Sequence, residues 1–302
     1  MTDPPDPGPD LETVFARYEA LRDRLPGAAF DTEPQLAATL EDVADRFDGF
    51  VLDAFGVLNL GETPIRGAVA RMARLRAMGK RLCVLTNAAS YPRAAAEARL
   101  RRLGFDFAAD EVVSSRDIAA AQLHAIAPGA LWAAICAEGD DFADIPALVA
   151  DAMAAPELLV RADAILFLSA ARWTEAWQDR LVSAIEALPR PVVIANPDLV
   201  APREGRLTIE PGWWGHDLAD RTGQMPHFFG KPYGDAFTAA RIRLGPGRHA
   251  MVGDTLHTDI LGGRAAGVRT VLVAGHGLFA GHDVAPFIAR SGIRPDAIVA
   301  TT

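Results

Sequence analysis

The sequence is poor in cysteine, and it lacks both a long hydrophobic run and an excess of basic residues. Its two cysteines, Cys83 and Cys136, each lie inside an apolar, strand-like stretch, which favours buried reduced thiols over a disulfide and fits a cytoplasmic protein. No stretch of about 18 uninterrupted apolar residues occurs, so no transmembrane helix is predicted. The net charge of −9 argues against nucleic acid or an anionic membrane as the main partner, because both attract basic patches.

Apolar residues, in contrast, are plentiful. Half of the 302 residues are hydrophobic, so the chain is able to bury the core of one large domain or of two moderate ones. The N-terminus, MTDPPDPGPDLE, is acidic and rich in proline, which predicts a disordered tail over residues 1–10 and is the opposite of a signal peptide. Helical patterns follow over residues 11–25 and 33–47.

Strand-like runs then alternate with helical patterns, which is typical of a parallel sheet with helices on its faces. The strand that opens in GFVLDAF is followed by a helix over residues 64–78, a strand over 81–85 and a helix over 92–103. The alternation resumes after residue 226 with a helix over 235–244, the strand HAMVGD, the helix TDILGGRAAG and the strand RTVLVAGHG. The block between has its own strands and the amphipathic helix TEAWQDRLVSAIEAL, so it is predicted to be a domain inserted into a discontinuous core.

Asp53 stands where the first apolar run, FVLDAFGVL, gives way to a polar turn. In open α/β sheets, ligands bind in the crevice at this carboxyl end of the strands. A carboxylate there is able to attack phosphorus and form an aspartyl-phosphate, and it also suits Mg²⁺, which prefers oxygen ligands. Taken alone, the D-x-x-G pattern is more typical of an aspartate that caps a turn. The functional interpretation therefore depends on three further segments.

Thr86, Asn87 and Lys231 are candidates for holding a phosphate. Thr86 and Asn87 end the run LCVLTN, where a hydroxyl and backbone N–H groups are suited to a phosphoryl oxygen, although an ordinary helix cap also explains them. Lys231, in FGKPYGDAF, would act as a point charge on phosphate, although most lysines are merely solvated.

Asp254 and Asp259 belong to the most informative segment, MVGDTLHTDI. Two carboxylates five residues apart are able to bracket a tight loop, so that one reaches Mg²⁺ while the other fixes the lysine or a water molecule. A turn that caps the next helix explains Thr258, but it does not explain the whole string GDTLHTDI-GG after a strand. Together, the four segments predict a site for Mg²⁺ and a phosphate.

In order and context, these segments resemble the four motifs of the haloacid dehalogenase (HAD) superfamily of phosphatases. LDAFGVLNLGETPIRGA, VLTNAAS, IANPDLVAP, FGKPYGDAF and MVGDTLHTDILGGRAAGVRTVLV are similar to segments of its subfamily IIA, the NagD-like or p-nitrophenylphosphatase-like group. The resemblance implies an α/β fold, with a HAD-like Rossmannoid parallel-sheet core and an inserted α/β cap domain of the C2 type. The implied parts are a tail and helix (1–30), a discontinuous core (31–109 and 227–302) and a cap (110–226).

The resemblance also implies a role for each matching residue. Asp53 would be the nucleophile and a Mg²⁺ ligand, together with the backbone carbonyl of Phe55 and with Asp254. Asp259 would ligate the metal or support Lys231.

The remaining roles concern the phosphate and the leaving group. By the same resemblance, Thr86 and Asn87 would bind the transferred phosphoryl group, and Lys231 would stabilise its charge. Asn196 and Asp198, in the cap, would contact the leaving group. The implied cofactor is Mg²⁺, and the implied partner is a small phosphorylated metabolite.

Phe55 departs from the family pattern, in which this position carries a second aspartate that protonates the leaving oxygen and then activates water. Such acid–base help typically contributes about 10²–10⁴-fold, so we expect a slow phosphatase or one limited to good leaving groups. Three replacements come into question: His257 on the fourth segment, and Asn59 and Glu62 just after the first. For His257, an exposed loop histidine is the simpler interpretation.

Two other interpretations stay open. The chain could be a pseudo-enzyme that binds Mg²⁺ and a phosphorylated ligand without turnover, and Phe55 is the residue on which this depends. A dinucleotide-binding protein is disfavoured, because no G-x-G-x-x-G follows the first strand. Since NagD-like relatives often pair through their caps, the resemblance also leaves a homodimer open.

Overall fold

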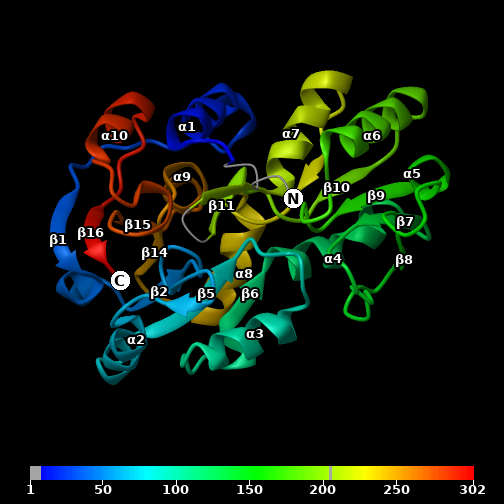
Figure 1. Cartoon of the computed structure of the whole chain (residues 1–302). Helices are drawn as coiled ribbons and strands as arrows, with labels where there is room; N and C mark the ends of the chain where they lie inside the picture. The colour runs from blue at the N-terminus through cyan, green and yellow to red at the C-terminus, as the bar shows by residue number, and fades with distance from the viewer. Residues whose placement is uncertain (1–7, 204–205) are drawn as a thin grey trace, which may run out of the picture. The chain divides into compact units, whose positions relative to one another are not determined.

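The structure is a computed structural model that describes residues 8–203 and 206–302 (Figure 1). The chain divides into two compact units. The first comprises Met1–Leu82, Val200–Ile209 and Pro246–Thr302, and the second comprises Cys83–Leu199 and Glu210–Gly245. Most of the predicted tail, residues 1–7, lies outside the described residues. The domain boundaries expected from the sequence remain a prediction.

Five parallel strands form the sheet of the first unit, in the order β1-β16-β15-β14-β2. They are β1 (Gln35–Thr39), β2 (Gly49–Leu52), β14 (His249–Gly253), β15 (Arg269–Val273) and β16 (Ala297–Thr301). Every residue of β2 and β14 is buried, as is typical of parallel strands that are covered on both faces. The carboxyl ends of these two neighbouring strands lie at the same edge of the sheet.

The other elements of the first unit are helices and two short hairpins. The helices are α1 (Leu11–Ala20), η1 (Arg22–Arg24), η2 (Leu40–Arg46), α2 (Ala68–Ala77), the π-helical turn η4 (Leu256–Ile260), α9 (Leu261–Ala265), η5 (Gly277–Phe279) and α10 (Ala285–Ser291). The hairpins pair β3 (Asn59–Leu60) with β4 (Thr63–Pro64), and β11 (Val200–Arg203) with β12 (Arg206–Ile209). Helix α1 lies beside α10 (Figure 1), where the rings of Phe15 and Phe287 are 5.1 Å apart.

The second unit contains a parallel pair and a five-stranded parallel sheet. The pair joins β5 (Arg81–Thr86), most of which belongs to this unit, to β6 (Val112–Ser114). The sheet has the order β13-β10-β9-β7-β8. Its strands are β7 (Leu131–Ile135), β8 (Leu148–Asp151), β9 (Ala164–Phe167), β10 (Val192–Ile194) and β13 (His227–Phe228).

Helices cover these strands and bury an apolar core between them. They are α3 (Arg93–Arg102), η3 (Ala109–Glu111), α4 (Ser115–Ile126), α5 (Leu158–Arg161), α6 (Glu175–Ala187), α7 (Pro211–Thr222) and α8 (Gly234–Leu244). One core cluster joins Leu123 of α4 to Trp132 of β7 and Leu166 of β9. Both cysteines are buried and free, as predicted, and burial raises the pKa of the Cys83 and Cys136 thiols to about 12.

The structure confirms the α/β class with parallel sheets, and it corrects one predicted helix. Residues 33–47 do not form a helix but the strand β1 followed by the 3₁₀ helix η2. The alanine-rich sequence of β1 is ambiguous, and parallel pairing with β16 decides its conformation. No helix among the described residues is long and apolar enough to span a membrane.

Candidate active site

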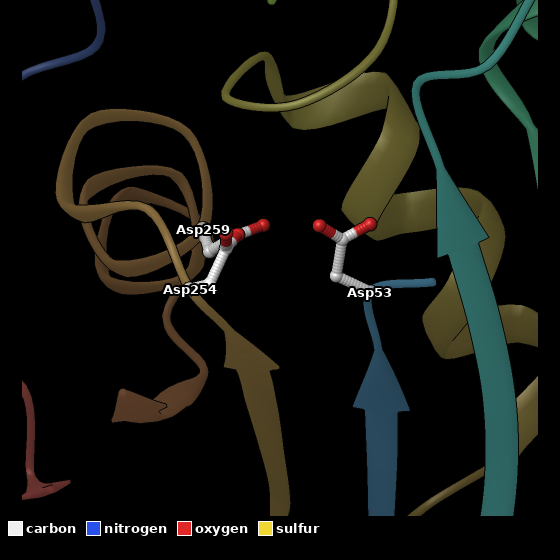
Figure 2. Close-up of side chains that lie close together, drawn as sticks. All are labelled: Asp53, Asp254 and Asp259. Atoms are coloured by element: carbon white, nitrogen blue, oxygen red, sulfur yellow. The ribbon is translucent and has the colours of Figure 1, made fainter. Parts of the chain in front are cut away.

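Three carboxylates meet at the carboxyl edge of the first unit's sheet. Asp53 follows β2, Asp254 follows β14, and Asp259 lies in the π-helical turn η4. Each offers an oxygen, and these oxygens all lie within 4.8 Å of one another. In Figure 2, the side chains of Asp254 and Asp259 point toward that of Asp53 across the gap between the two strand ends.

Strand register explains why residues far apart in the sequence become neighbours. Strands β2 and β14 pair in parallel with Leu52 opposite Val252, and the N–H of Asp53 donates to the Val252 carbonyl at 2.9 Å. The residues that follow the two strands therefore emerge side by side. This register brings Asp53 and Asp254 together as predicted, and the η4 turn that follows Asp254 adds Asp259 to the group.

Backbone and hydroxyl donors fix the orientation of these carboxylates. One Asp254 oxygen accepts from the N–H of Leu278 at 2.7 Å, and the other accepts from the Thr255 hydroxyl at 3.2 Å. The N–H of Thr255 donates to Asp259 at 3.0 Å. Asp254 and Asp259 are buried, whereas Asp53 is only partly covered. The two buried carboxylates are thus held rigidly, and Asp53 keeps some access to solvent.

Three glycines make room for this arrangement, because a Cβ at any of them would overlap a carboxylate. A Cβ on Gly56 would lie 2.5 Å from Asp254, and one on Gly253 would lie 2.0 Å from Asp259. Gly277 has φ +67°, and its Cβ would lie 1.7 Å from an Asp254 oxygen. Because these three residues have no side chain, the backbone comes closer to the carboxylates than any other residue would allow.

The carboxylate cluster suits a divalent cation. Carboxylates packed this closely repel one another, and a cation between them removes that repulsion. An all-oxygen donor set is the one that Mg²⁺ prefers. The residues present therefore fit the metal that the sequence predicts, with Asp53, Asp254 and Asp259 as the carboxylates that would hold it.

Phe55 and its candidate replacements lie in the same unit. Phe55 forms an isolated backbone bridge with Asn59, whose side chain is completely buried and donates to the Gly61 carbonyl at 2.9 Å. An amide does not titrate, so Asn59 cannot replace a general acid. Glu62 is exposed on the turn between β3 and β4.

His257 is not the exposed loop histidine that the sequence suggested. Only 1% of its surface is accessible, and its Nε2 lies 2.6 Å from a carboxylate oxygen of Glu19 in helix α1. Burial lowers the pKa of His257, and the hydrogen bond from His257 lowers the pKa of Glu19. With this nitrogen bound to Glu19, His257 is a poor candidate for the missing acid.

The other predicted site residues belong to the second unit, where Asn87 connects them. The Asn87 side-chain oxygen accepts from the N–H of Lys231 at 2.7 Å, and its amide nitrogen donates to the Lys231 carbonyl and to Asp198, both at 2.9 Å. The N–H of Asp198 in turn donates to Asn196 at 3.0 Å. Asn87 thereby holds the backbone of Lys231 on both sides, and its predicted contact with substrate remains a prediction.

Thr86 and Asn196 each have a protein partner. The hydroxyl of Thr86 accepts from the N–H of Ala88 at 3.1 Å, as in a turn that closes the end of β5. The amide of Asn196 donates to the buried Glu210 at 3.1 Å. Their predicted roles toward a phosphoryl group and a leaving group remain predictions.

Sequence reasoning missed Arg116, which stabilises the loop after β5. This fully buried arginine of α4 pairs with Asp140 at 2.6 Å and Asp144 at 2.7 Å, and it donates to the Ala89 carbonyl at 3.2 Å. Beside it, the Ser115 hydroxyl donates to the Asn87 carbonyl at 2.8 Å. No local signal separates Arg116 from the other arginines of the chain, since its partners are distant in sequence.

The fold and the site define an α/β protein with an acidic, metal-type centre at the carboxyl edge of a parallel sheet. Two family models match it: haloacid dehalogenase-like hydrolase over residues 50–143, and HAD-hydrolase-like over residues 228–301. Glycerol-3-phosphate phosphatase of Gallus gallus is 33% identical, covering 86% of this chain and 91% of the relative. The chain therefore belongs to the haloacid dehalogenase-like hydrolase family.

Solved structures agree with this assignment. A possible sugar phosphatase of the HAD superfamily from Cytophaga hutchinsonii matches with a TM-score of 0.77 at 23% identity, covering 89% of this chain and 98% of that chain. Glycerol phosphate phosphatase from Mycobacterium tuberculosis in complex with magnesium matches with a TM-score of 0.68 at 29% identity, covering 86% and 76%. The predicted HAD-like α/β fold with a cap domain is confirmed.

Replacing Gly277 by alanine tests the close approach of backbone to Asp254. We expect Gly277→Ala to lower the free energy of unfolding by about 1–3 kcal/mol more than the matched control Gly292→Ala. Gly292 has φ +68° with nothing within 4 Å, so the control carries the same backbone strain without the overlap. Urea unfolding of both variants gives the comparison. Equal losses in the free energy of unfolding would mean that the loop around Asp254 shifts to accommodate the added methyl group at little cost.

Replacing Asn87 by leucine tests its hold on Lys231. We expect Asn87→Leu to abolish the exchange protection of the Lys231 amide and to destabilise the protein by about 1–3 kcal/mol, because buried partners lose their hydrogen bonds. Hydrogen exchange read by NMR checks the first effect. Gln178→Leu is the control, since Gln178 is an equally buried amide that bonds the indole of Trp173 and the Trp214 carbonyl. It should destabilise the chain while leaving Lys231 protected; protection retained in Asn87→Leu would refute the contact.

Proposed function

We propose that the chain is a Mg²⁺-dependent phosphatase that hydrolyses a small phosphorylated polyol, such as glycerol phosphate, through an aspartyl-phosphate on Asp53. The observation that carries this proposal is the meeting of Asp53 with Asp254 and Asp259 at one edge of the sheet. The names of the Gallus gallus and Mycobacterium tuberculosis relatives support the substrate class, and the magnesium complex of the latter supports the metal.

Asp53 is suited to be the nucleophile because it is the most accessible of the three carboxylates. One of its oxygens accepts the N–H of Ala54 at 2.8 Å, which fixes the side chain at the strand end. The other oxygen attacks phosphorus, and the bond between phosphorus and the leaving oxygen breaks. A water molecule then attacks the phosphorus of the aspartyl-phosphate, which releases phosphate and restores the Asp53 carboxylate.

Asp53, Asp254 and Asp259 would hold Mg²⁺, with the backbone carbonyl of Phe55 as a further oxygen donor. When bound, Mg²⁺ would neutralise phosphate charge next to the nucleophile. Asp254 and Asp259 keep their orientation through fixed N–H donors, so they would stay in place as ligands while Asp53 reacts. Lys231 would balance charge on the transferred phosphoryl group, and Thr86 would bind one of its oxygens.

Phe55 determines which esters are turned over. An alkoxide such as that of glycerol leaves poorly without a proton, whereas p-nitrophenolate leaves readily as an anion. A phenylalanine donates no proton and activates no water, so alkyl phosphates are the substrates most affected. We therefore infer a slow phosphatase with a marked preference for good leaving groups.

A second candidate function is binding of Mg²⁺ and a phosphorylated ligand without turnover. Phe55 is the observation that favours it, because the metal carboxylates do not depend on the side chain at this position. The two candidates differ in whether an aspartyl-phosphate forms on Asp53 and is hydrolysed.

Replacing Asp53 by asparagine tests the nucleophile. We expect Asp53→Asn to reduce Mg²⁺-dependent phosphate release from p-nitrophenyl phosphate by at least about 10³-fold, because an amide is not a nucleophile toward phosphorus. Phosphate release with and without Mg²⁺ is the measurement, and unchanged thermal unfolding controls for the fold. Equal hydrolysis by the variant and the wild type would show that Asp53 is not the nucleophile. If the wild type releases no phosphate from any ester, the binding function becomes the better account.

Replacing Phe55 by aspartate tests the missing acid. We expect Phe55→Asp to raise the rate with glycerol phosphate by about 10²-fold or more, and the rate with p-nitrophenyl phosphate by much less. Steady-state kcat values for both esters provide the comparison. Phe55→Asn is the matched control. Asparagine is similar in size to aspartate but has no titratable proton, so this variant should give no such gain. An equal gain with both esters, or with both variants, would argue against a missing proton donor.

A further inference from the structure

Helix α1 contacts the side chain of His257, which lies in the turn between two members of the carboxylate cluster of the same unit. This residue lies in the π-helical turn η4, three positions after Asp254 and two before Asp259. Its side chain points away from solvent, and its Nε2 lies 2.6 Å from Glu19 of α1. The loop that carries two metal-type carboxylates is therefore tied to a helix near the other end of the sequence.

Three residues on one face of α1 surround the His257 ring. Tyr18 stacks on it with ring centroids 4.7 Å apart and an interplanar angle of 5°, and Phe15 meets its edge at 5.5 Å. Glu19 provides the carboxylate. Positions 15, 18 and 19 share a helix face, so α1 presents an aromatic wall and a hydrogen-bond acceptor together. The two aromatic rings fix the position and orientation of the imidazole, and Glu19 accepts its hydrogen bond.

The turn that His257 belongs to is of a kind that needs such support. In η4, the N–H of Ile260 donates to the Thr255 carbonyl at 3.3 Å, five residues back, and the N–H of Asp259 donates to the same carbonyl at 3.1 Å. Single π-helical turns are rare and are frequently found at functional sites. The Asp259 carboxylate also accepts the N–H of Thr255, so the fold of η4 and the position of Asp259 beside Asp254 are linked.

We propose that α1 is a positioning element of the metal site, in which Glu19 and Tyr18 hold His257 and thereby keep Asp254 and Asp259 in the geometry that binds Mg²⁺. The inference rests on the proposed function only for the identity of the metal. Glu19, Tyr18 and His257 are positioning residues, since they act on the carboxylates through the η4 backbone.

A second anchor of α1 provides the control for this proposal. Glu12 pairs with Arg290 of α10 at 2.8 Å, and the Arg290 guanidinium lies 4.5 Å from the Phe15 ring centre. Glu12 therefore attaches the same helix to the same unit, and its ion pair is with α10 rather than with η4. Loss of either anchor weakens the docking of α1, but of the two glutamates it is Glu19 that contacts His257.

The test compares Glu19→Leu, Glu19→Gln and Glu12→Leu in the full-length protein. We expect Glu19→Leu to weaken Mg²⁺ binding about tenfold in isothermal titration calorimetry, a typical effect of losing a residue that orients a metal ligand. Glu19→Gln keeps an oxygen acceptor for His257 and should retain most of the affinity. Glu12→Leu should bind Mg²⁺ as the wild type does. Equal weakening by Glu19→Leu and Glu12→Leu, or none by Glu19→Leu, overturns the proposal.

A second readout separates this inference from the proposed function. In the metal-free proteins, amide hydrogens of residues 255–261 should exchange faster in Glu19→Leu than in Glu12→Leu, because the η4 turn opens more often. If the wild type binds no Mg²⁺, the proposed metal dependence fails, while the exchange rates still decide whether α1 positions the turn. If the wild type binds Mg²⁺ but hydrolyses no ester, the phosphatase fails and both readouts still apply. Identical exchange in the two variants overturns the role of α1.

Discussion

The mutual repulsion of three carboxylates is the constraint on which the candidate site depends. Asp53, Asp254 and Asp259 bring oxygens within 4.8 Å of one another, and two of the three are buried. Such a cluster is stable only where donors or cations compensate each charge. The chain supplies donors from its backbone, with the N–H groups of Leu278 and Thr255 as the clearest cases. Glycines such as Gly277 let the backbone come close enough for its N–H groups to donate to the carboxylates, so the loops at this sheet edge compensate the charges.

Much of this site could be predicted from the sequence, and the reason is physical. Fully apolar strands such as β2 and β14 are buried in a parallel sheet, and their carboxyl ends share one edge. A carboxylate directly after each strand, as with Asp53 and Asp254, is therefore close to its counterpart whatever the intervening chain does. The α/β class, the helices that end at glycines and the buried thiols follow from similarly local patterns.

What the sequence did not predict depends on partners that are distant in the chain. The segment over residues 33–47 reads as a helix, yet pairing with β16 makes its first part the strand β1. His257 reads as an exposed loop residue until α1 is seen to cover it. The bonds from the Asn87 amide to the backbone of Lys231, 144 residues away, are likewise invisible in the local sequence, while its predicted contact with a phosphoryl group stays a prediction. For β1 and His257, the local pattern fits two environments equally well, and a long-range contact decides between them.

A phenylalanine at position 55 is compatible with this architecture, because the proposed function separates two tasks. Holding a cation depends on carboxylates fixed by backbone donors, and none of those donors is the side chain at position 55. In the proposed mechanism, a side chain at that position would move a proton to the leaving oxygen, and Phe55 has none to donate. In the proposed function, a phenylalanine there would remove acid–base help of about 10²–10⁴-fold, while the carboxylates that would attack phosphorus and hold a cation keep their places. On that proposal the remaining chemistry is nucleophilic attack, so the leaving group of the substrate would set the rate at which the first bond breaks.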